Sequence, residues 1–305
     1  MNRASQFLII TAAVCWGSTG IFTRPLFASG LTSFEMTSIR SLFTSVCLLT
    51  LLSVTNRKVL TLRLKDVGLF ICMGSFGNAL MSILYFNTVD MITMSAASLL
   101  LYTSPYMVII MSAAIFKEKI TLQKLSALFI AFTGCVMTVG FFGGAGTPAI
   151  GIATGLGAAF CYAVYNILAK LALLRGYSPF AVSAYVYTIA GVLMIPFCDY
   201  RKVAGLIVEN HVDLIYLLML SFFISTLPSL CYFKGLEKTE PGRAMIIAFV
   251  EPMTASAAGF IAFDEMLTPV KLLGMALILL SLVILNLQAP NNRRRRRTDT
   301  PPDSA

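Results

Sequence analysis

Ten apolar runs, each about 20 residues long, follow one another along the chain and restrict the folds open to it. An α-helix of this length crosses roughly 30 Å of hydrocarbon. Because lipid offers the backbone no hydrogen-bond partner, so long a spanning segment must satisfy its own backbone groups as a helix. The predicted spans are residues 6–23, 34–54, 67–88, 94–116, 125–142, 149–173, 180–197, 214–235, 244–263 and 270–287. The expected fold is an all-α membrane protein with ten transmembrane helices.

The composition fits a bilayer and offers little that could hold a metal or a cofactor. Of the 305 residues, 57% are hydrophobic and 12% are charged, whereas about a quarter of a soluble globular protein is charged. The seven cysteines lie within or beside the apolar runs and lack the C-x-x-C spacing of zinc sites. The single histidine, His211, stands in a short polar segment. We therefore expect no metal site and no cofactor.

Positive charges gather on one side of the predicted spans. If the first residues are cytoplasmic, that side holds 18 of the 23 Lys and Arg residues and the other side holds four, while Arg40 lies within a span. Lys and Arg accumulate in cytoplasmic loops, so both termini are expected to be cytoplasmic. Five of these charges, Arg293 to Arg297, lie in a tail with the composition of disordered chain. We expect this tail to contact anionic lipid rather than nucleic acid.

The second half of the chain repeats the first. The stretch SPYMVIIMSAAIFKEKIT, beginning at Ser104, aligns without a gap with EPMTASAAGFIAFDEMLT, which begins 147 residues later at Glu251. An offset of 146 aligns an earlier segment, in which Gly30 matches Gly176. A unit of five spans is odd, so its second copy enters the membrane from the opposite side; the exchange of KEK for DEM agrees with that inversion. We expect two inverted five-helix repeats, residues 1–143 and 144–289, followed by the tail, residues 290–305.

This topology favours a secondary transporter. An inverted repeat relates the bundle to itself by a pseudo-twofold axis in the membrane plane, which allows one architecture to open to either side. The chain has no GxxxxGK[ST] loop for ATP, no serine and histidine placed for proteolysis, no pair of facing membrane aspartates and no ion filter. An enzyme or a channel is therefore disfavoured, and a membrane scaffold or receptor is a remote alternative.

Several segments together resemble the EamA-type carriers of the drug/metabolite transporter superfamily. They are CWGSTGIFTR, SIRSLFTSVCLL, SLLLYTSPYMVIIMSAAIFKEKITLQKLSALFIAFTGCVM and AFVEPMTASAAGFIAFDEMLTPVKLLGMALILLSLVI. The resemblance implies a carrier of the bacterial cytoplasmic membrane with a central cavity between its halves. It also implies export of amino acids or related metabolites by alternating access. Uncoupled exchange or facilitated diffusion of nucleosides, sugars or cationic drugs is the alternative.

The expected partners follow from this class of protein. They are a small-molecule substrate, membrane lipids and protons as a candidate coupling ion, with no nucleic acid. The protein is expected to be a monomer or a homodimer.

Two ionisable residues lie well inside predicted spans, where charge is costly and marks candidate functional sites. Glu251 is expected near the midplane, where it binds a substrate amine, carries a coupling proton or braces a helix kink. Pro252 beside it and its counterpart Pro105 each remove one helix hydrogen bond, so both are expected to kink their helices. Arg40 either grips a substrate carboxylate or is structural, snorkelling outward or pairing with Glu35.

Polar and aromatic residues expected at midplane depth complete the candidate site. Tyrosine and tryptophan that face lipid belong at the interfaces, so near the midplane they must face protein or a cavity. The candidates are Trp16, Asn78, Ser82, Tyr85, Tyr102, Tyr106, Tyr162, Asn166 and Tyr232. Each by itself suits helix packing, whereas their concentration predicts a cavity for a small amphipathic solute.

Two further features are expected to be structural. Gly151 and Gly155 form a GxxxG pattern that favours close packing of helices within one molecule. Glu118 and Glu265 occupy equivalent turns and are expected to cap the helices that follow, where negative charge is favourable.

Overall fold

The chain folds into a bundle of helices. A computed structural model describes residues 3–92, 94–139 and 148–287, and none of these residues lies in a strand. Ten helices among them are long and apolar enough to cross a membrane, as predicted. The predicted junction between the repeats, at residues 143 and 144, and the tail at 290–305 lie outside the described residues.

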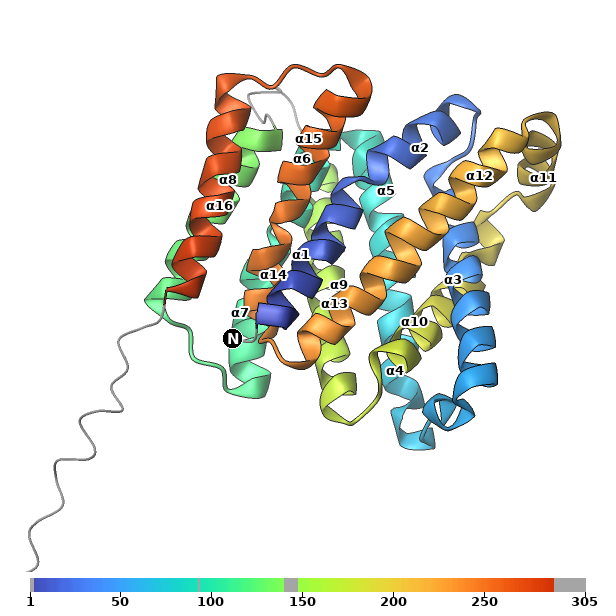
Figure 1. Cartoon of the computed structure of the whole chain (residues 1–305), viewed down its shortest axis with the longest axis horizontal. Helices are drawn as coiled ribbons and strands as arrows, with labels where there is room; N and C mark the ends of the chain where they lie inside the picture. Colours follow the sequence, from blue (N-terminus) through green and yellow to red (C-terminus); the bar gives the residue numbers. More distant parts are fainter. Residues whose placement is uncertain (1–2, 93, 140–147, 288–305) are drawn as a thin grey trace, which may run out of the picture.

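Each half of the chain provides five of these spans (Figure 1). The spans of the first half are α1 (Arg3–Gly17) with α2 (Thr19–Ala28), α3 (Ser33–Thr55), α4 (Val67–Gly74) with η3 (Ser75–Leu80) and α5 (Met81–Met91), α6 (Met94–Leu101) with α7 (Ser104–Phe116), and α8 (Leu122–Val139). Those of the second half are α9 (Ala149–Leu174), α10 (Pro179–Met194) with η4 (Ile195–Phe197), α12 (His211–Met219) with η5 (Leu220–Thr226) and α13 (Leu227–Glu237), α14 (Pro241–Ala248) with α15 (Val250–Phe263), and α16 (Pro269–Asn286). The connections contain η1 (Arg57–Leu60), η2 (Leu64–Asp66) and α11 (Tyr200–Glu209).

The two ends of the bundle carry different turns. We call the end where α1 begins and α16 ends the terminal face; it is the lower end in Figure 1. It carries the turns at residues 117–121, 175–178 and 238–240. The opposite face carries the turns at 29–32 and 264–268, together with α11.

Helices of the two halves pack so that equivalent helices make equivalent contacts. The second spans, α3 and α10, contact each other, and so do the fifth spans, α8 and α16. The contact of α1 with α13 has its counterpart in the contact of α9 with α5. Between α8 and α16 the backbones touch, since a Cβ on Gly134 would lie 2.6 Å from the Gly274 carbonyl oxygen. The core is therefore formed between the halves rather than within each one.

Unusual backbone conformations recur at the repeat offset. Among the described residues, Lys117 and Asp264 are the non-glycine residues with positive φ, at 55° and 53°, and they lie 147 positions apart. The glycines with positive φ are Gly30, at 93°, and Gly176, at 88°, which the alignment had paired. A left-handed residue commonly ends a helix, and glycine adopts that conformation without steric cost. Local geometry and sequence thus mark the same repeat.

Both third spans contain a π-helical segment at matching positions. These segments are η3 and η5, whose last residues, Leu80 and Thr226, are 146 positions apart. A π-bulge accommodates one extra residue in a helix and is frequent at functional sites. No feature of the sequence pattern had indicated either segment.

Both fourth spans are interrupted immediately before their prolines. The first break, at residues 102–103, separates α6 from α7, and the second, at Phe249, separates α14 from α15. Pro105 and Pro252 stand in the first turns of the helices that follow. A proline is tolerated there because a first-turn N–H has no partner within the helix.

The structure corrects two details of the sequence interpretation. His211, expected in a short polar segment, is the first residue of α12, and the helix α11 precedes it. Glu118 and Glu265 do not cap helices: the hydroxyl of Thr121 accepts from the Lys124 N–H at 3.2 Å, and that of Thr268 accepts from the Lys271 N–H at 3.3 Å.

The GxxxG pattern packs inside the molecule. A Cβ on Gly151 would meet Ile92, and one on Gly155 would meet Leu100. Close contact between helices of one chain accounts for both glycines.

Candidate functional site

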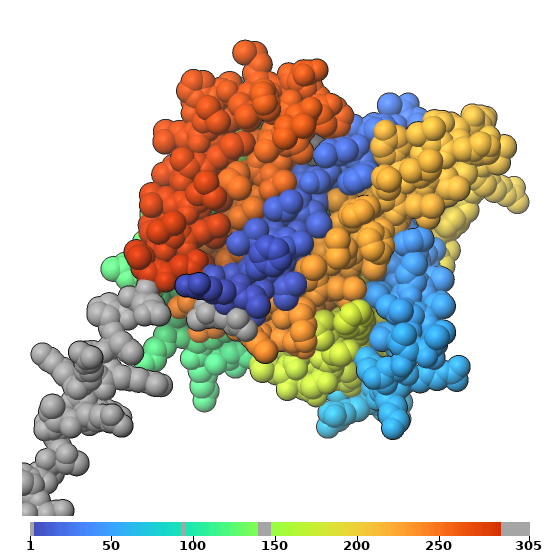
Figure 2. All heavy atoms as spheres, in the orientation of Figure 1, coloured from blue at the N-terminus to red at the C-terminus, as the bar shows by residue number. Residues whose placement is uncertain are grey.

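Glu251 lies where α1 crosses α15. Figure 2 shows α1 running between α15 and α13 across this face of the bundle, and it contacts both. A Cβ on Gly17 would lie 2.5 Å from the Glu251 carbonyl oxygen and 2.6 Å from the Thr254 Cβ. The glycine of the Trp-Gly motif therefore permits the close approach of α1 that holds the backbone at Glu251.

Tyrosines from three other spans lie near the Glu251 side chain. The Tyr102 hydroxyl, at the break between α6 and α7, lies next to the carboxyl group. Tyr85 of α5 and Tyr162 of α9 lie within its electrostatic range, as does Cys135 of α8. We call these five residues the acid cluster. It joins both halves of the molecule, and all its predicted members are at least half-buried.

A second group of predicted residues forms a buried structural contact beside the acid cluster. The Tyr232 hydroxyl donates to the Asn166 Oδ1 at 2.5 Å, and its ring centroid lies 5.4 Å from that of Trp16. The Asn166 amide donates in turn to the carbonyl oxygen of Tyr162 at 2.8 Å. Tyr232 and Asn166 are 2% and 0% exposed. The hydrogen bonds of Tyr232 and Asn166 are thus made within the protein. Through the Asn166 amide, these two residues also hold the backbone of Tyr162.

Three predicted residues occupy other places. Tyr106 packs edge-on against Phe132, with ring centroids 5.6 Å apart. Asn78, in η3, and Ser82, in α5, are buried. Asn78 Oδ1 has no hydrogen-bond partner within the described part of the chain.

Arg40 points into the bundle and does not pair with Glu35. Its Nη1 donates to the hydroxyl of Ser225, in η5, at 3.3 Å. Glu35 instead closes a capping box with Thr32 and accepts from the Lys202 ammonium at 3.2 Å. The alternative in which Arg40 is neutralised by Glu35 is therefore wrong.

Tyr187 completes the surroundings of Arg40 and was missed by sequence reasoning. It lies within electrostatic range of Arg40, and its hydroxyl donates to the Ser225 carbonyl oxygen at 3.4 Å. The offset of 146 that aligns this part of the chain pairs Arg40 with Val186, the residue beside Tyr187, so the repeat gave no direct signal for Tyr187.

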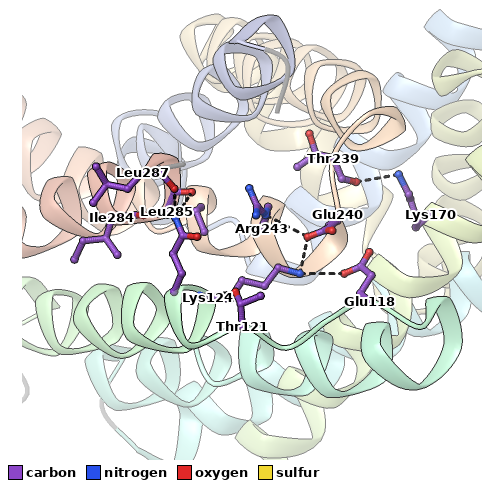
Figure 3. A network of polar contacts seen from close by, with 11 residues as sticks. Glu118, Thr121, Lys124, Lys170, Thr239, Glu240, Arg243, Ile284, Leu285 and Leu287 are labelled. Carbon is purple, nitrogen blue, oxygen red and sulfur yellow. Dashed lines mark hydrogen bonds and ion pairs between the residues drawn. The ribbon is translucent and has the colours of Figure 1, made fainter. Parts of the chain in front are cut away.

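A network of charges closes the terminal face (Figure 3). The Lys124 ammonium, in α8, lies 2.5 Å from Glu240 and 3.7 Å from Glu118, and Arg243 lies 3.2 Å from Glu240. The Lys170 ammonium donates to the carbonyl oxygens of Leu236, Glu237 and Thr239 at 2.7, 3.0 and 2.9 Å. We call these contacts the terminal-face network. Through Lys124 it connects the first half of the chain with the second.

One contact between the halves on the opposite face is more exposed. Arg24 pairs with Glu265 and lies over the Phe263 ring, 4.2 Å from its centroid. The repeat offsets relate Arg24 to Lys170 and Glu265 to Glu118. The two faces thus use equivalent positions to hold the halves together, with different partners.

Known proteins share this sequence pattern and fold. The sequence model of the EamA-like transporter family matches residues 3–140 and 149–287. The uncharacterized transporter YetK of Bacillus subtilis is 25% identical over 284 residues, covering 91% of this chain and 86% of its own. A probable amino-acid metabolite efflux pump of Escherichia coli is 24% identical over 305 residues, covering 93% and 95%.

A solved crystal structure shares the fold. It superposes with a TM-score of 0.80 at 15% sequence identity, covering 98% of this chain and 100% of that one. The matched family is one of transporters, which have two repeats and are not enzymes. With ten membrane helices and a family match over both halves, this chain is an integral, multi-pass membrane protein of the EamA-like transporter family.

Proposed function

We propose that this protein exports amino acids or related small metabolites across a bacterial cytoplasmic membrane by alternating access. The acid cluster carries the proposal, because Glu251 is a carboxylic acid placed among helices of both halves, immediately after a helix break. A relative named as an amino-acid metabolite efflux pump supports the choice of substrate.

The acid cluster has the chemistry needed for a substrate amine or a proton. A carboxylate attracts an ammonium group, and tyrosine hydroxyls both donate and accept hydrogen bonds. Since tyrosines of several helices lie near Glu251, movement of one half against the other changes its surroundings. A coupling group in an alternating-access carrier needs this property.

We further propose that the terminal face is cytoplasmic. The turns there concentrate lysine and arginine, as cytoplasmic loops do. In the terminal-face network the Lys124 and Glu118 side chains are 5% and 13% exposed, and Arg243 and Glu240 are 28% and 43% exposed. Arg24 and Glu265 on the opposite face are 51% and 36% exposed. The burial of Lys124 between the two halves supports a state that is closed towards the cytoplasm.

The same cluster suggests a second candidate, the facilitated diffusion or exchange of organic cations. A carboxylate flanked by three tyrosines can bind a cation through both charge and aromatic faces. This candidate needs no substrate carboxylate and no proton gradient.

Efflux from proteoliposomes distinguishes the two candidates. Vesicles are loaded with amino acids, nucleosides and a quaternary ammonium dye, and loss of each solute is followed with and without a pH gradient. We expect gradient-driven loss of amino acids that Glu251→Gln abolishes. Glu209→Gln, an exposed change at the end of α11, is the matched control and should behave as the unchanged protein. Gradient-independent loss of the dye alone would favour the second candidate.

A further inference from the structure

Arg40 differs in its partners from the two buried lysines, Lys124 and Lys170, and from the more exposed Lys202. Lys124 faces two glutamates, Lys202 faces Glu35, and Lys170 is held by three carbonyl oxygens. Arg40 belongs to none of the ion pairs formed within residues 3–92, 94–139 and 148–287. It is also placed within a membrane span, seven residues after α3 begins. The positive charge of Arg40 therefore has no counter-ion within the described residues.

The guanidinium cannot be explained by snorkelling. Its Nη1 contacts the Ser225 hydroxyl, and Ser225 is 0% exposed while the neighbouring Tyr187 is 6% exposed. The charged group is therefore directed towards the interior, where η5 and α10 meet α3. Arginine has five N–H donors, and Ser225 is the one acceptor that Arg40 contacts in the described residues.

An unneutralised charge inside a membrane protein is costly and is characteristic of a functional site. The planar guanidinium matches a carboxylate, which it binds through two parallel hydrogen bonds. An incoming carboxylate would supply both the missing charge and acceptors for the unused N–H groups. Ser225 and Tyr187 add hydroxyl groups beside the same position.

The surroundings of Arg40 connect with the acid cluster. Tyr162 lies within electrostatic range of both Glu251 and Tyr187, and Tyr187 lies within range of Arg40. Tyr162 and Tyr187, both contributed by the second half, therefore lie near Glu251 and near Arg40, respectively. This arrangement suits a solute that carries both charges.

We propose that Arg40, with Ser225 and Tyr187, forms a subsite for the carboxylate of the transported solute. The inference rests on the proposed transport function and narrows its substrate class to carboxylate-bearing metabolites, amino acids included. Nucleosides, sugars and cationic drugs lack the group that this subsite requires.

Thermal unfolding of the purified full-length protein tests the subsite without relying on transport. The probes are the twenty amino acids, their amides, and 4-methylpentanoate, which is leucine without its amino group. We expect at least one amino acid to raise the Tm while its amide does not. If leucine raises the Tm, 4-methylpentanoate should raise the Tm as well. Sodium chloride at equal ionic strength controls for nonspecific anion effects.

Variants then assign the response to Arg40. Arg40→Gln should weaken apparent carboxylate binding about tenfold or more, because a charge-assisted bidentate contact is lost. Arg40→Lys should restore part of the carboxylate binding, since lysine keeps the positive charge but lacks the planar guanidinium that forms two parallel hydrogen bonds. Arg201→Gln, an exposed change at the opposite face, is the control.

Two outcomes would overturn the subsite: no carboxylate-specific response in the unchanged protein, or a full response in Arg40→Gln. If the unchanged protein shows no amino-acid efflux but still shows the Arg40-dependent rise in Tm, the export proposal is overturned and the subsite stands. Conversely, if Arg40→Gln leaves amino-acid efflux unchanged, the export proposal stands and the subsite is excluded.

Discussion

Equivalent residues of the two halves have diverged, and the candidate site owes its chemistry to that divergence. The repeat places Glu251 opposite Ser104, and Arg40 opposite Val186. If both copies carried the glutamate, two like charges would meet near the pseudo-twofold axis, which is unfavourable in a low dielectric. One acid and one base, each opposed by an uncharged residue, avoid that repulsion.

Gly17 is the residue whose role is easiest to isolate. Gly17→Ala places a methyl group against the Glu251 carbonyl oxygen and the Thr254 side chain, so we expect a loss of about 1–3 kcal/mol of stability. In Gly20→Ala the new methyl group meets nothing within 4 Å, and the helix gains from replacing glycine. Thermal unfolding of both variants in detergent measures the difference. Equal Tm values for the two would show that α1 and α15 are not in tight contact.

The elements differ in how far the sequence predicts them. The ten spans are visible because lipid requires long apolar runs, and the breaks before Pro105 and Pro252 follow from the missing N–H. The segments η3 and η5 have no such signal, since a π-bulge depends on packing rather than on composition. Helix α11 is hidden because its ten residues are too few to resemble a span.

Most residues of the candidate site were among those expected from the sequence, but their grouping was not. Tyrosines at midplane depth had to face inward, yet depth along a helix does not specify which neighbours a side chain meets. The sequence therefore could not separate Tyr85, Tyr102 and Tyr162, which surround Glu251, from Tyr106, which packs on Phe132. Cys135 and Tyr187 were missed for the same reason.

The break in the ninth span offers a test at the scale of an element. Pro252→Ala supplies an N–H that can bond to the Ala248 carbonyl oxygen, so we expect α14 and α15 to approach one continuous helix. This change should displace Glu251 and lower efflux about tenfold without lowering the Tm. Pro105→Ala is the matched control, because Ser104 stands there in place of the acid. The role of the break is excluded if both variants retain full efflux.

The whole molecule is joined at its two faces by contacts that the repeat makes equivalent but not identical. On the terminal face, Lys124 links Glu118 of the first half with Glu240 of the second. On the opposite face, the Arg24–Glu265 and Lys202–Glu35 pairs do the same. Exposed pairs contribute little, whereas removing one partner of a buried pair costs several kcal/mol. The conformational equilibrium should therefore respond far more to Lys124 than to a surface lysine.

Spin labels on the terminal face can measure that response directly. Lys119 and Lys238 are exposed, lie on turns of different halves, and serve as label positions once the seven native cysteines are replaced. We expect Lys124→Met to add a longer component to the label distance distribution, because Glu118 and Glu240 then repel each other across the gap between the halves. Lys234→Met removes an exposed pair with Glu237 within one helix and should leave the distribution unchanged. If both variants give the distribution of the parent protein, the terminal-face network does not hold the halves together, and closure of this face must rest on other contacts, such as helix packing and the Arg175–Asp66 pair.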